Sequence, residues 1–260
     1  MNLFYERCSM EQSLNDLVNY CNERLRVASI EDYEGAVNGL QFQNSGKVRC
    51  IASAVDGSLE VIQKAADLNV QLLIVHHGLF WGKHVPIIKN FYEKYKLLIQ
   101  NDIAVYSCHL PLDGHPEIGN NAQIAKLLGL KNTYPEFEFH NEKVGVAGEL
   151  TTQRSDLKSK LLQHFPKLTA MEFGPDKINK IGICSGGSGV VISMADQLGI
   201  NTIIVGECNQ YLYNVAREHH INAYICGHYA TETFGVHALG QELSQKFHLP
   251  YQVIPTECPL

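Results

Sequence analysis

The chain lacks the features that would place it in a membrane or outside the cell. It has no run of about 18 apolar residues, the length that a membrane-spanning helix requires. Residues 1–8 include Glu6 and Arg7, where a secretion signal needs an apolar stretch. The eight cysteines are scattered and form no C-x-x-C pair, which suits reduced, half-buried thiols. We therefore expect a soluble, cytoplasmic protein with no membrane association.

Basic charge is also scarce. Against 27 acidic residues the chain has 21 basic ones, a net charge of -6 at pH 7, and no Lys/Arg cluster stands out. Nucleic-acid binding relies on neutralising phosphates, so this balance argues against a nucleic-acid partner. Glycine and proline, 21 and 9, are close to ordinary usage, which excludes a fibrous or disordered chain. A chain of 260 residues can bury one large core or two small ones.

Short β-branched runs alternate with helical stretches from Cys50 onward, after an amphipathic helix that follows a capping-box pattern at Ser9 and Gln12. Strands are expected near residues 50–55, 70–75, 103–107, 180–184, 202–206, 222–226 and 251–254. Helices are expected near residues 58–68, 86–100, 118–129, 155–165, 188–198, 209–219 and 232–247. Continuous apolar strands of this kind suit sheets that are covered on both faces, and the alternation predicts the α/β fold class.

The two halves of the chain repeat one pattern. Shifts of 130 and then 119 residues superpose polar positions, namely His76-His77 on Gly206-Glu207, His109 on His228, and Asp113 on Glu232. Such a repeat predicts two similar three-layer α/β lobes. We expect a first lobe over residues 1–130, including the N-terminal helix, and a second over 179–260. A connecting hairpin or helix segment would occupy 131–178, and the whole would form one compact unit.

Polar side chains follow several of the predicted strands, where ligands bind in open α/β sheets. They are His76, His77, His109, Asp113, His228 and Glu232. Imidazole and carboxylate together suit Zn, Mn, Fe or Ni, and the absence of thiolate argues against a closed structural zinc site. Four or more such ligands exceed what one open catalytic ion needs. Two ions about 3.5–4 Å apart would use them all.

Each of these patterns also has an ordinary structural explanation. An isolated histidine is usually a satisfied structural residue, and adjacent histidines point to opposite sides of a strand unless the chain bends tightly. The loop Gly186-Gly187-Ser188-Gly189 fits a tight turn, or a phosphate cradle at a helix N-terminus that lacks the lysine of a P-loop. The turn-like run Asn38-Gly39-Leu40-Gln41 says nothing alone.

Taken together, the motifs resemble a known family. They are Asn38-Gly39-Leu40-Gln41, Val75-His76-His77-Gly78-Leu79-Phe80-Trp81, His109-Leu110-Pro111-Leu112-Asp113, Gly186-Gly187-Ser188-Gly189, Gly206-Glu207 and Gly227-His228-Tyr229-Ala230-Thr231-Glu232. In this order, from about Leu14 to Ile254, they resemble the Nif-three-like dinuclear-metal family, whose members are also called GTP cyclohydrolase I type 2 homologues. The double histidine and the Gly-His-x-x-x-Glu motif are specific, whereas the glycine loop is not.

The resemblance implies two similar α/β lobes with a pair of divalent transition-metal ions (Zn, Fe, Mn or Ni) in the cleft between them. It also implies a homo-oligomer, a hexameric ring made of three dimers. The metal ligands carried over from the family are His76, His77, Asp113, His228 and Glu232. His109 would be a further ligand or a neighbour of the site, and Glu207 would orient water. These two are the candidate catalytic residues.

The motifs and the resemblance support one leading hypothesis for the function and two alternatives. The first is a metal-dependent hydrolase resembling GTP cyclohydrolase I type 2, in which water attacks a purine nucleotide or a phosphoester. The second is a metal-containing regulatory or binding protein, with a protein or nucleic-acid partner and no turnover. Metal storage or delivery is a third. Fold and metal alone do not determine the substrate.

Overall fold

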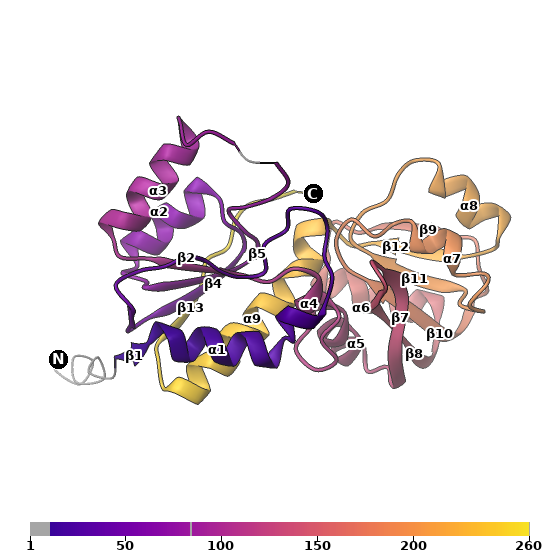
Figure 1. Ribbon diagram of the computed structural model, residues 1–260. Coiled ribbons are helices and arrows are strands. Elements are labelled where there is room, and N and C mark those ends of the chain that lie inside the picture. The colour runs from indigo at the N-terminus through magenta and orange to yellow at the C-terminus, as the bar shows by residue number, and fades with distance from the viewer. Residues whose placement is uncertain (1–10, 84, 260) are drawn as a thin grey trace. The chain divides into compact units, whose positions relative to one another are not determined.

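The computed structural model describes residues 11–83 and 85–259, which form two compact units (Figure 1). Unit 1 comprises the described residues up to Leu112 together with Val236–Glu257, and unit 2 comprises Asp113–Gly235. Each unit is built around one mixed β-sheet with helices against it, so the predicted α/β class is confirmed. Among the described residues, every helix is too short or too polar to cross a lipid bilayer.

Unit 1 contains a five-stranded sheet in the order β13-β4-β5-β6-β2, in which β2 is antiparallel to β6 and the other pairs are parallel. The short strands β1 and β3 pair separately. The elements are β1 (Gln12–Ser13), α1 (Leu14–Arg24), a 3-10 helix (Val27–Ser29), β2 (Gly39–Phe42), β3 (Lys47–Val48), β4 (Ile51–Asp56), α2 (Leu59–Asp67), β5 (Leu72–His77), α3 (Asn90–Gln100), β6 (Ala104–Ser107), the later part of α9 (His228–Phe247) and β13 (Tyr251–Val253).

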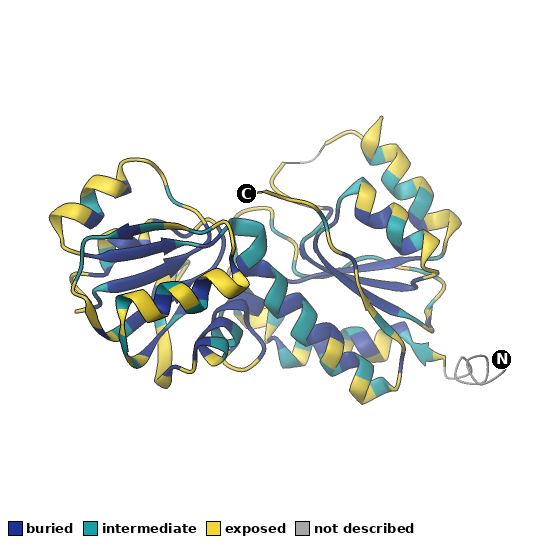
Figure 2. Ribbon diagram, turned by 180° about the vertical axis from the view of Figure 1, so that it is seen from behind, coloured by how far each residue is buried: buried dark blue, intermediate teal, exposed yellow. Residues whose placement is uncertain are grey.

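Helices cover both faces of the unit 1 sheet. Helices α2 and α3 lie on one face, and α1 with the later part of α9 lies on the other (Figure 1). The strands β4 and β5 are buried on both faces except at the last residue of each, and the centre of this sheet is dark blue in Figure 2. This explains why their apolar runs are continuous rather than alternating. Arg24 on α1 binds Glu242 on α9 at 2.8 Å, which ties these two helices together.

Unit 2 contains a six-stranded sheet in the order β7-β8-β10-β11-β12-β9, with β10, β11 and β12 parallel and the remaining pairs antiparallel. The short helix α4 (Leu110–Asp113) leads the chain into it. The elements are α5 (Asn120–Leu128), β7 (Lys131–Phe139), β8 (Glu142–Gln153), α6 (Arg154–His164), β9 (Thr169–Glu172), β10 (Lys177–Cys184), α7 (Val191–Met194), β11 (Thr202–Val205), α8 (Leu212–Glu218), β12 (Asn222–Ile225) and the start of α9.

The core of unit 2 lies between its sheet and the helices α5 and α6. Leu157 and Leu161 of α6 join Ile181 and Ile183 of β10 in one buried cluster. Side chains two residues apart on a strand share a face, so Ile181 and Ile183 point to the same side. The helices α7 and α8 lie over the opposite face (Figure 1).

Several helices differ at their ends from the sequence predictions. Ser9 of the expected capping box lies outside the described residues, and Gln12 belongs to β1 rather than to the first helical turn. Helix α1 begins at Leu14 with Ser13 at its N-cap. The helix expected over 86–100 begins only at Asn90, because the preceding Lys89 has a φ of +52°, outside the right-handed helical region. The helix expected over 188–198 shortens to α7.

The two compact units divide the chain elsewhere than the expected segments 1–130, 131–178 and 179–260. The hairpin β7-β8 does occupy the expected connecting stretch, but its strand β8 pairs with β10 and thereby joins the sheet of unit 2. The C-terminal stretch returns to unit 1, because Tyr251 of β13 pairs with Ile51 of β4. Pairing between segments so far apart in the chain leaves no local trace in the sequence.

Candidate metal centre

Three imidazoles come together at one edge of the unit 1 sheet. His76 and His77 are the last two residues of β5, and His109 follows β6, its parallel neighbour. One nitrogen of each ring lies within 4.8 Å of the other two. The ring centroid of His76 is 4.9 Å from that of His77 and 4.9 Å from that of His109. Parallel strands end at the same edge of a sheet, which is why these residues meet.

The adjacent histidines both reach this cluster, although strand alternation would separate them. Their environments do differ as alternation requires, since His76 is fully buried and His77 is partly exposed. The strand β5 ends at His77, so the side chain of its last residue is no longer confined to one face of a continuing strand. The pair supplies one buried and one half-buried imidazole to the same cluster.

Each imidazole is held through its Nδ1 atom. The acceptors are the carbonyl oxygen of Cys108 for His76 at 2.9 Å, Oδ1 of Asp56 for His77 at 2.9 Å, and Oδ1 of Asp32 for His109 at 2.8 Å. A carbonyl or ionised carboxylate oxygen only accepts, so Nδ1 donates in each of these bonds and Nε2 is the ring atom through which a metal ion can be bound. Metal-binding histidines are commonly oriented in this way.

Asp32 is the most heavily bonded of these acceptors. It accepts hydrogen bonds from the backbone N–H of Tyr33 and of Leu110 and from the side-chain amide of Asn38, besides His109. Burial by itself raises the pKa of Asp32, but the bonds from His109 and Asn38 outweigh it and hold that pKa below its ordinary value. Asn38 also accepts from the backbone N–H of His109 at 2.7 Å. The turn-like motif at residues 38–41 therefore positions His109.

Unit 2 carries a different set of donors, centred on the first turn of α9. His228 Nε2 lies 3.1 Å from Oε1 of Glu232, and His228 Nδ1 lies 3.4 Å from Oε1 of Glu207. The predicted one-turn spacing of His228 and Glu232 on a helix is thus observed. The hydrogen bond with Glu232 raises the pKa of His228 to about 9, with burial opposing and Glu207 adding to the effect. In this arrangement His228 is protonated at neutral pH.

Glycines of the loop at residues 186–189 are required by this pair. Gly186 has a φ of +65°, and a Cβ there would collide with Oε1 of Glu232. A Cβ at Gly187 would lie 3.3 Å from Oε1 of Glu207. The backbone N–H of Gly186 donates to the hydroxyl of Thr231 at 3.0 Å, which fastens the loop to α9. Close approach to the two carboxylates explains these glycines without a phosphate.

Asp113 is held separately inside unit 2. Its Oδ1 accepts from the side-chain amide of Asn120 at 2.8 Å and from the hydroxyl of Ser185 at 3.1 Å, and the residue is buried. Among the described residues, no group of three donors within 4.8 Å includes Asp113 or Glu207.

Sequence reasoning missed the two carboxylates that orient His77 and His109. Asp56 is the last residue of β4 and pairs in register with His77, so the rule that selected the strand-end histidines would also have found it. Asp32 lies in an irregular segment before β2, where no periodicity or motif marks it. Only the folded chain connects it with His109.

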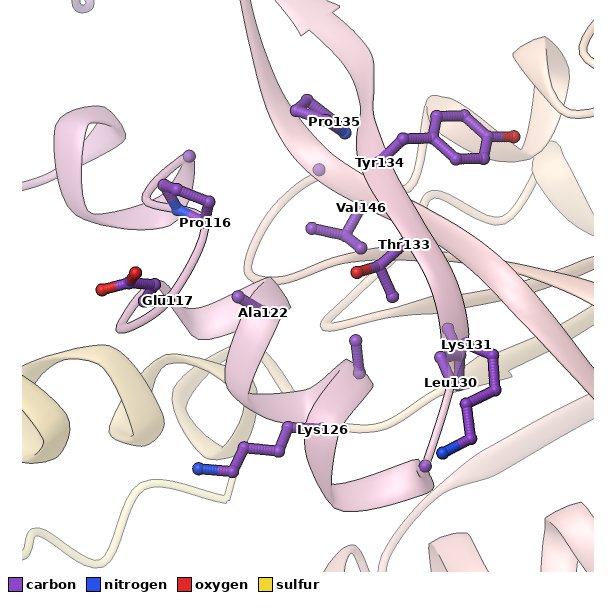
Figure 3. A pocket seen from close by; sticks show the side chains of 14 residues that line it. Pro116, Glu117, Ala122, Lys126, Leu130, Lys131, Thr133, Tyr134, Pro135 and Val146 are labelled. Carbon is purple, nitrogen blue, oxygen red and sulfur yellow. The ribbon is translucent and has the colours of Figure 1, made fainter.

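A pocket of about 470 Å³ lies elsewhere, between α5 and the β7-β8 hairpin of unit 2 (Figure 3). Its wall is largely apolar, with Thr133 and Val146 of the strands facing Ala122 of α5. None of the seven candidate site residues is among its lining residues. The pocket is therefore no part of the metal-donor clusters.

The buried histidine and glutamate clusters are compatible with metal binding, by the chemistry of their donors. Imidazole nitrogens oriented through Nδ1 and carboxylates paired with a single cation are groups that divalent transition metals accept. In unit 2, His228 lies 3.1 Å from the buried Glu232 and compensates its negative charge, a role that a cation is also able to serve.

Comparison with known proteins agrees with the fold and the motifs. The chain is 36% identical over 243 residues, 92% of both chains, to a protein of Deinococcus radiodurans named GTP cyclohydrolase 1 type 2 homolog. A protein of the same name from Escherichia coli K12 is 35% identical over 250 residues, 94% of this chain and 98% of the relative. A solved structure from Thermus thermophilus matches with a TM-score of 0.88 and 31% identity, over 96% of this chain and 100% of that one. Residues 12–259 match the family described as Duf34/NIF3 (NGG1p interacting factor 3), and the chain belongs to that family.

Proposed function

We propose that the chain binds two divalent transition-metal ions through His76, His77, Asp113, His228 and Glu232. The observation that carries this proposal is the common orientation of the unit 1 imidazoles, each held at Nδ1 by an oxygen acceptor. Hydrogen bonding of this kind is expected of metal ligands, and its repetition on three neighbouring rings favours ligation over the ordinary pairing of one structural histidine. The buried carboxylates of unit 2 supply the negative charge that two divalent cations require.

We further propose that the chain is a metal-dependent hydrolase of purine nucleotides or phosphoesters. The names of the relatives support the first substrate class, because they are called homologues of a GTP cyclohydrolase. Bound divalent ions would lower the pKa of a water molecule and polarise the group that it attacks. The chain's own residues would orient the substrate and carry protons.

Two side chains suit the proton transfers. Glu207 is partly exposed and lies 3.4 Å from Nδ1 of His228 through its Oε1 atom, so its carboxylate is accessible to water beside the donors. His109 is fixed by Asp32 at Nδ1, which leaves Nε2 as the atom that accepts a proton or joins the ligands. A general base must lie within hydrogen-bond reach of the proton that it removes.

Assembly is a separate proposal. From the family resemblance of the motifs, we infer a hexameric ring of three dimers. We also infer that an internal repeat relates the two units. The strand order supports the repeat, since the parallel strands β4-β5-β6 of unit 1 and β10-β11-β12 of unit 2 are each followed by one antiparallel strand, β2 and β9. Sedimentation velocity of the purified chain tests the ring directly. A monomer or a single dimer at micromolar concentration would contradict it.

Turnover is tested with protein purified without chelator and then reconstituted with zinc, manganese or iron. GTP, other nucleoside triphosphates and a generic phosphoester are incubated with the wild-type chain and with Glu207→Gln. We expect metal-dependent product with the wild type and a large loss of rate in the variant. Bound metal without turnover of any substrate would instead favour the regulatory or binding role.

A further inference from the structure

Two aromatic side chains of unit 1 are exposed to solvent beside the imidazole cluster. Trp81 is 50% exposed and Tyr33 is 42% exposed, and their ring centroids are 6.4 Å apart. The indole of Trp81 contacts His109 edge to face at 4.8 Å and His77 at 6.0 Å. Tyr33 lies 5.7 Å from the same His109 ring. Both aromatic rings therefore border the nitrogen donors directly.

Glycines hold the loops that carry these rings against each other. A Cβ on Gly35, whose φ is +83°, would lie 2.5 Å from the Cα of Gly82. Two backbones can approach this closely only without side chains. Tyr33 is two residues from Gly35, and Trp81 directly precedes Gly82, so this contact sets the spacing of the two aromatic rings.

Side-chain hydrogen bonds fix the same two loops. Oε1 of Gln41 accepts from the backbone N–H of Leu79 at 2.5 Å, while its amide donates to the carbonyl of Val37 at 2.6 Å. Asp32, which orients His109, also accepts from the backbone N–H of Tyr33 at 2.7 Å. One carboxylate thus holds both the imidazole of His109 and the backbone at Tyr33. The aromatic pair is a built part of the site rather than the tip of an unattached loop.

We propose that Trp81 and Tyr33 form the binding surface for a flat, conjugated ring of the substrate. Large aromatic faces left in water beside polar donors favour a ligand that stacks on them, because every conjugated ring presents a π-face. A nucleobase meets this requirement, and a phosphate group alone does not. This inference rests on the proposed function and specifies how the substrate binds. The conjugated ring of the substrate, rather than its phosphates, would lie against Trp81 and Tyr33.

Fluorescence tests the proposal directly, because Trp81 is the sole tryptophan of the chain. The intact protein is titrated with guanosine, adenosine and uridine, and with inorganic triphosphate as the probe that lacks a ring. We expect saturable quenching of the tryptophan emission by at least one nucleoside and none by triphosphate. Absence of saturable quenching by all three nucleosides would overturn the proposal, as would equal quenching by triphosphate.

Variants then separate stacking from mere proximity. Calorimetric titration with the tightest nucleoside should show at least about tenfold weaker binding for Trp81→Ala and Tyr33→Ala, and a smaller loss for Trp81→Phe, which keeps a π-face. The matched control is Tyr92→Ala on α3, where the tyrosine is 53% exposed and lies outside these ring contacts. Unchanged affinity in the Trp81 and Tyr33 variants would contradict the proposal.

Metal content, measured on the same samples, distinguishes this inference from the proposed function. The aromatic variants should keep the metal of the wild type, because neither ring supplies a ligand atom. A wild-type chain that binds nucleosides but no metal would defeat the metal proposal and leave the aromatic surface standing. A chain that binds metal but no nucleoside would overturn the aromatic binding surface and leave the metal proposal intact.

Discussion

The two units use the same positions of similar sheets for different donors. In unit 1, donors end β5 and follow β6, and in unit 2 they follow β11 and β12. Under the shifts of 130 and 119 residues, His77 corresponds to Glu207, His109 to His228, and Asp113 to Glu232. The fold thus determines where a donor lies, and the side chain at that place determines its charge.

Charge is the difference between the two sets. Unit 1 presents three imidazoles. Its carboxylates Asp32 and Asp56 accept hydrogen bonds from two of these rings, His109 and His77. Unit 2 presents carboxylates directly, with His228 protonated between Glu207 and Glu232. Neutral nitrogen donors and anionic oxygen donors are complementary toward a divalent ion. Two units with identical donor residues would have supplied only imidazoles or only carboxylates.

Removal of a unit 2 carboxylate should have the largest effect. We expect Asp113→Ala and Glu232→Ala each to abolish binding of at least one metal ion, since each change removes one of the two anionic ligands of the proposed site. Native mass spectrometry measures the metal content, and circular dichroism checks that the fold persists. Full metal content in either folded variant would show that unit 1 binds its metal without unit 2.

The carboxylates behind the unit 1 imidazoles should have a smaller effect. Asp32→Asn and Asp56→Asn each weaken the acceptor that holds an imidazole at Nδ1, so metal affinity should fall roughly 10- to 100-fold. Competition with a chromogenic chelator measures it. Asp196→Asn is the matched control, because Asp196 bonds the exposed His219 at 3.1 Å. An equal loss in that control would remove the special role of Asp32 and Asp56.

Gly186→Ala should act through the unit 2 pair. Its positive φ makes alanine unfavourable by about 1–2 kcal/mol, and the new Cβ must displace Glu232. Gly199 has a φ of +61° and no atom within 4 Å of an added Cβ, so Gly199→Ala reports the backbone strain alone. Chemical denaturation and metal titration should show equal or greater destabilisation for Gly186→Ala, and lower metal affinity only there. Equal metal affinity in both variants would contradict the close approach of this loop to Glu232.

The smallest effect concerns helix capping, where the units also differ. The hydroxyl of Ser58 accepts from the backbone N–H of Val61 and caps α2, whereas its counterpart Ser188 donates to the carbonyl of Cys184. Ser58→Ala should lower the free energy of unfolding by about 1 kcal/mol and leave metal binding unchanged. Urea denaturation measures the loss. Altered metal content in Ser58→Ala would mean that α2 positions the donors, which the account does not predict.

Local patterns in the sequence predicted the parts of the fold that local physics determines. The apolar run that became β5 and the one-turn spacing of His228 and Glu232 both depend on residues close in the chain. Edge strands such as β2 and β9 escaped prediction, because four residues at a sheet edge need no distinctive pattern. The return of β13 to β4 escaped as well, since that pairing is made between distant segments.

Some residues of the candidate site could likewise be predicted from the sequence, and others could not. Residues at strand ends could be selected from the sequence, because the end of a buried strand is visible as the end of an apolar run. The partner of His109 could not, since Asp32 precedes it by 77 residues in an irregular segment. The aromatic pair escaped for a related reason. Tyr33 and Trp81 meet only because Gly35 lies against Gly82.

Metal stoichiometry decides whether the chain carries a dinuclear centre. The chain is purified without chelator or an affinity nickel column, and its metal is counted by inductively coupled plasma mass spectrometry. The same count is made for His76→Ala/His228→Ala and for the exposed control His219→Ala. We expect about two transition-metal ions per chain in the wild type and the control, and loss of metal in the double variant. Little or no metal in the wild type, with no uptake of added zinc, manganese or iron, would contradict it.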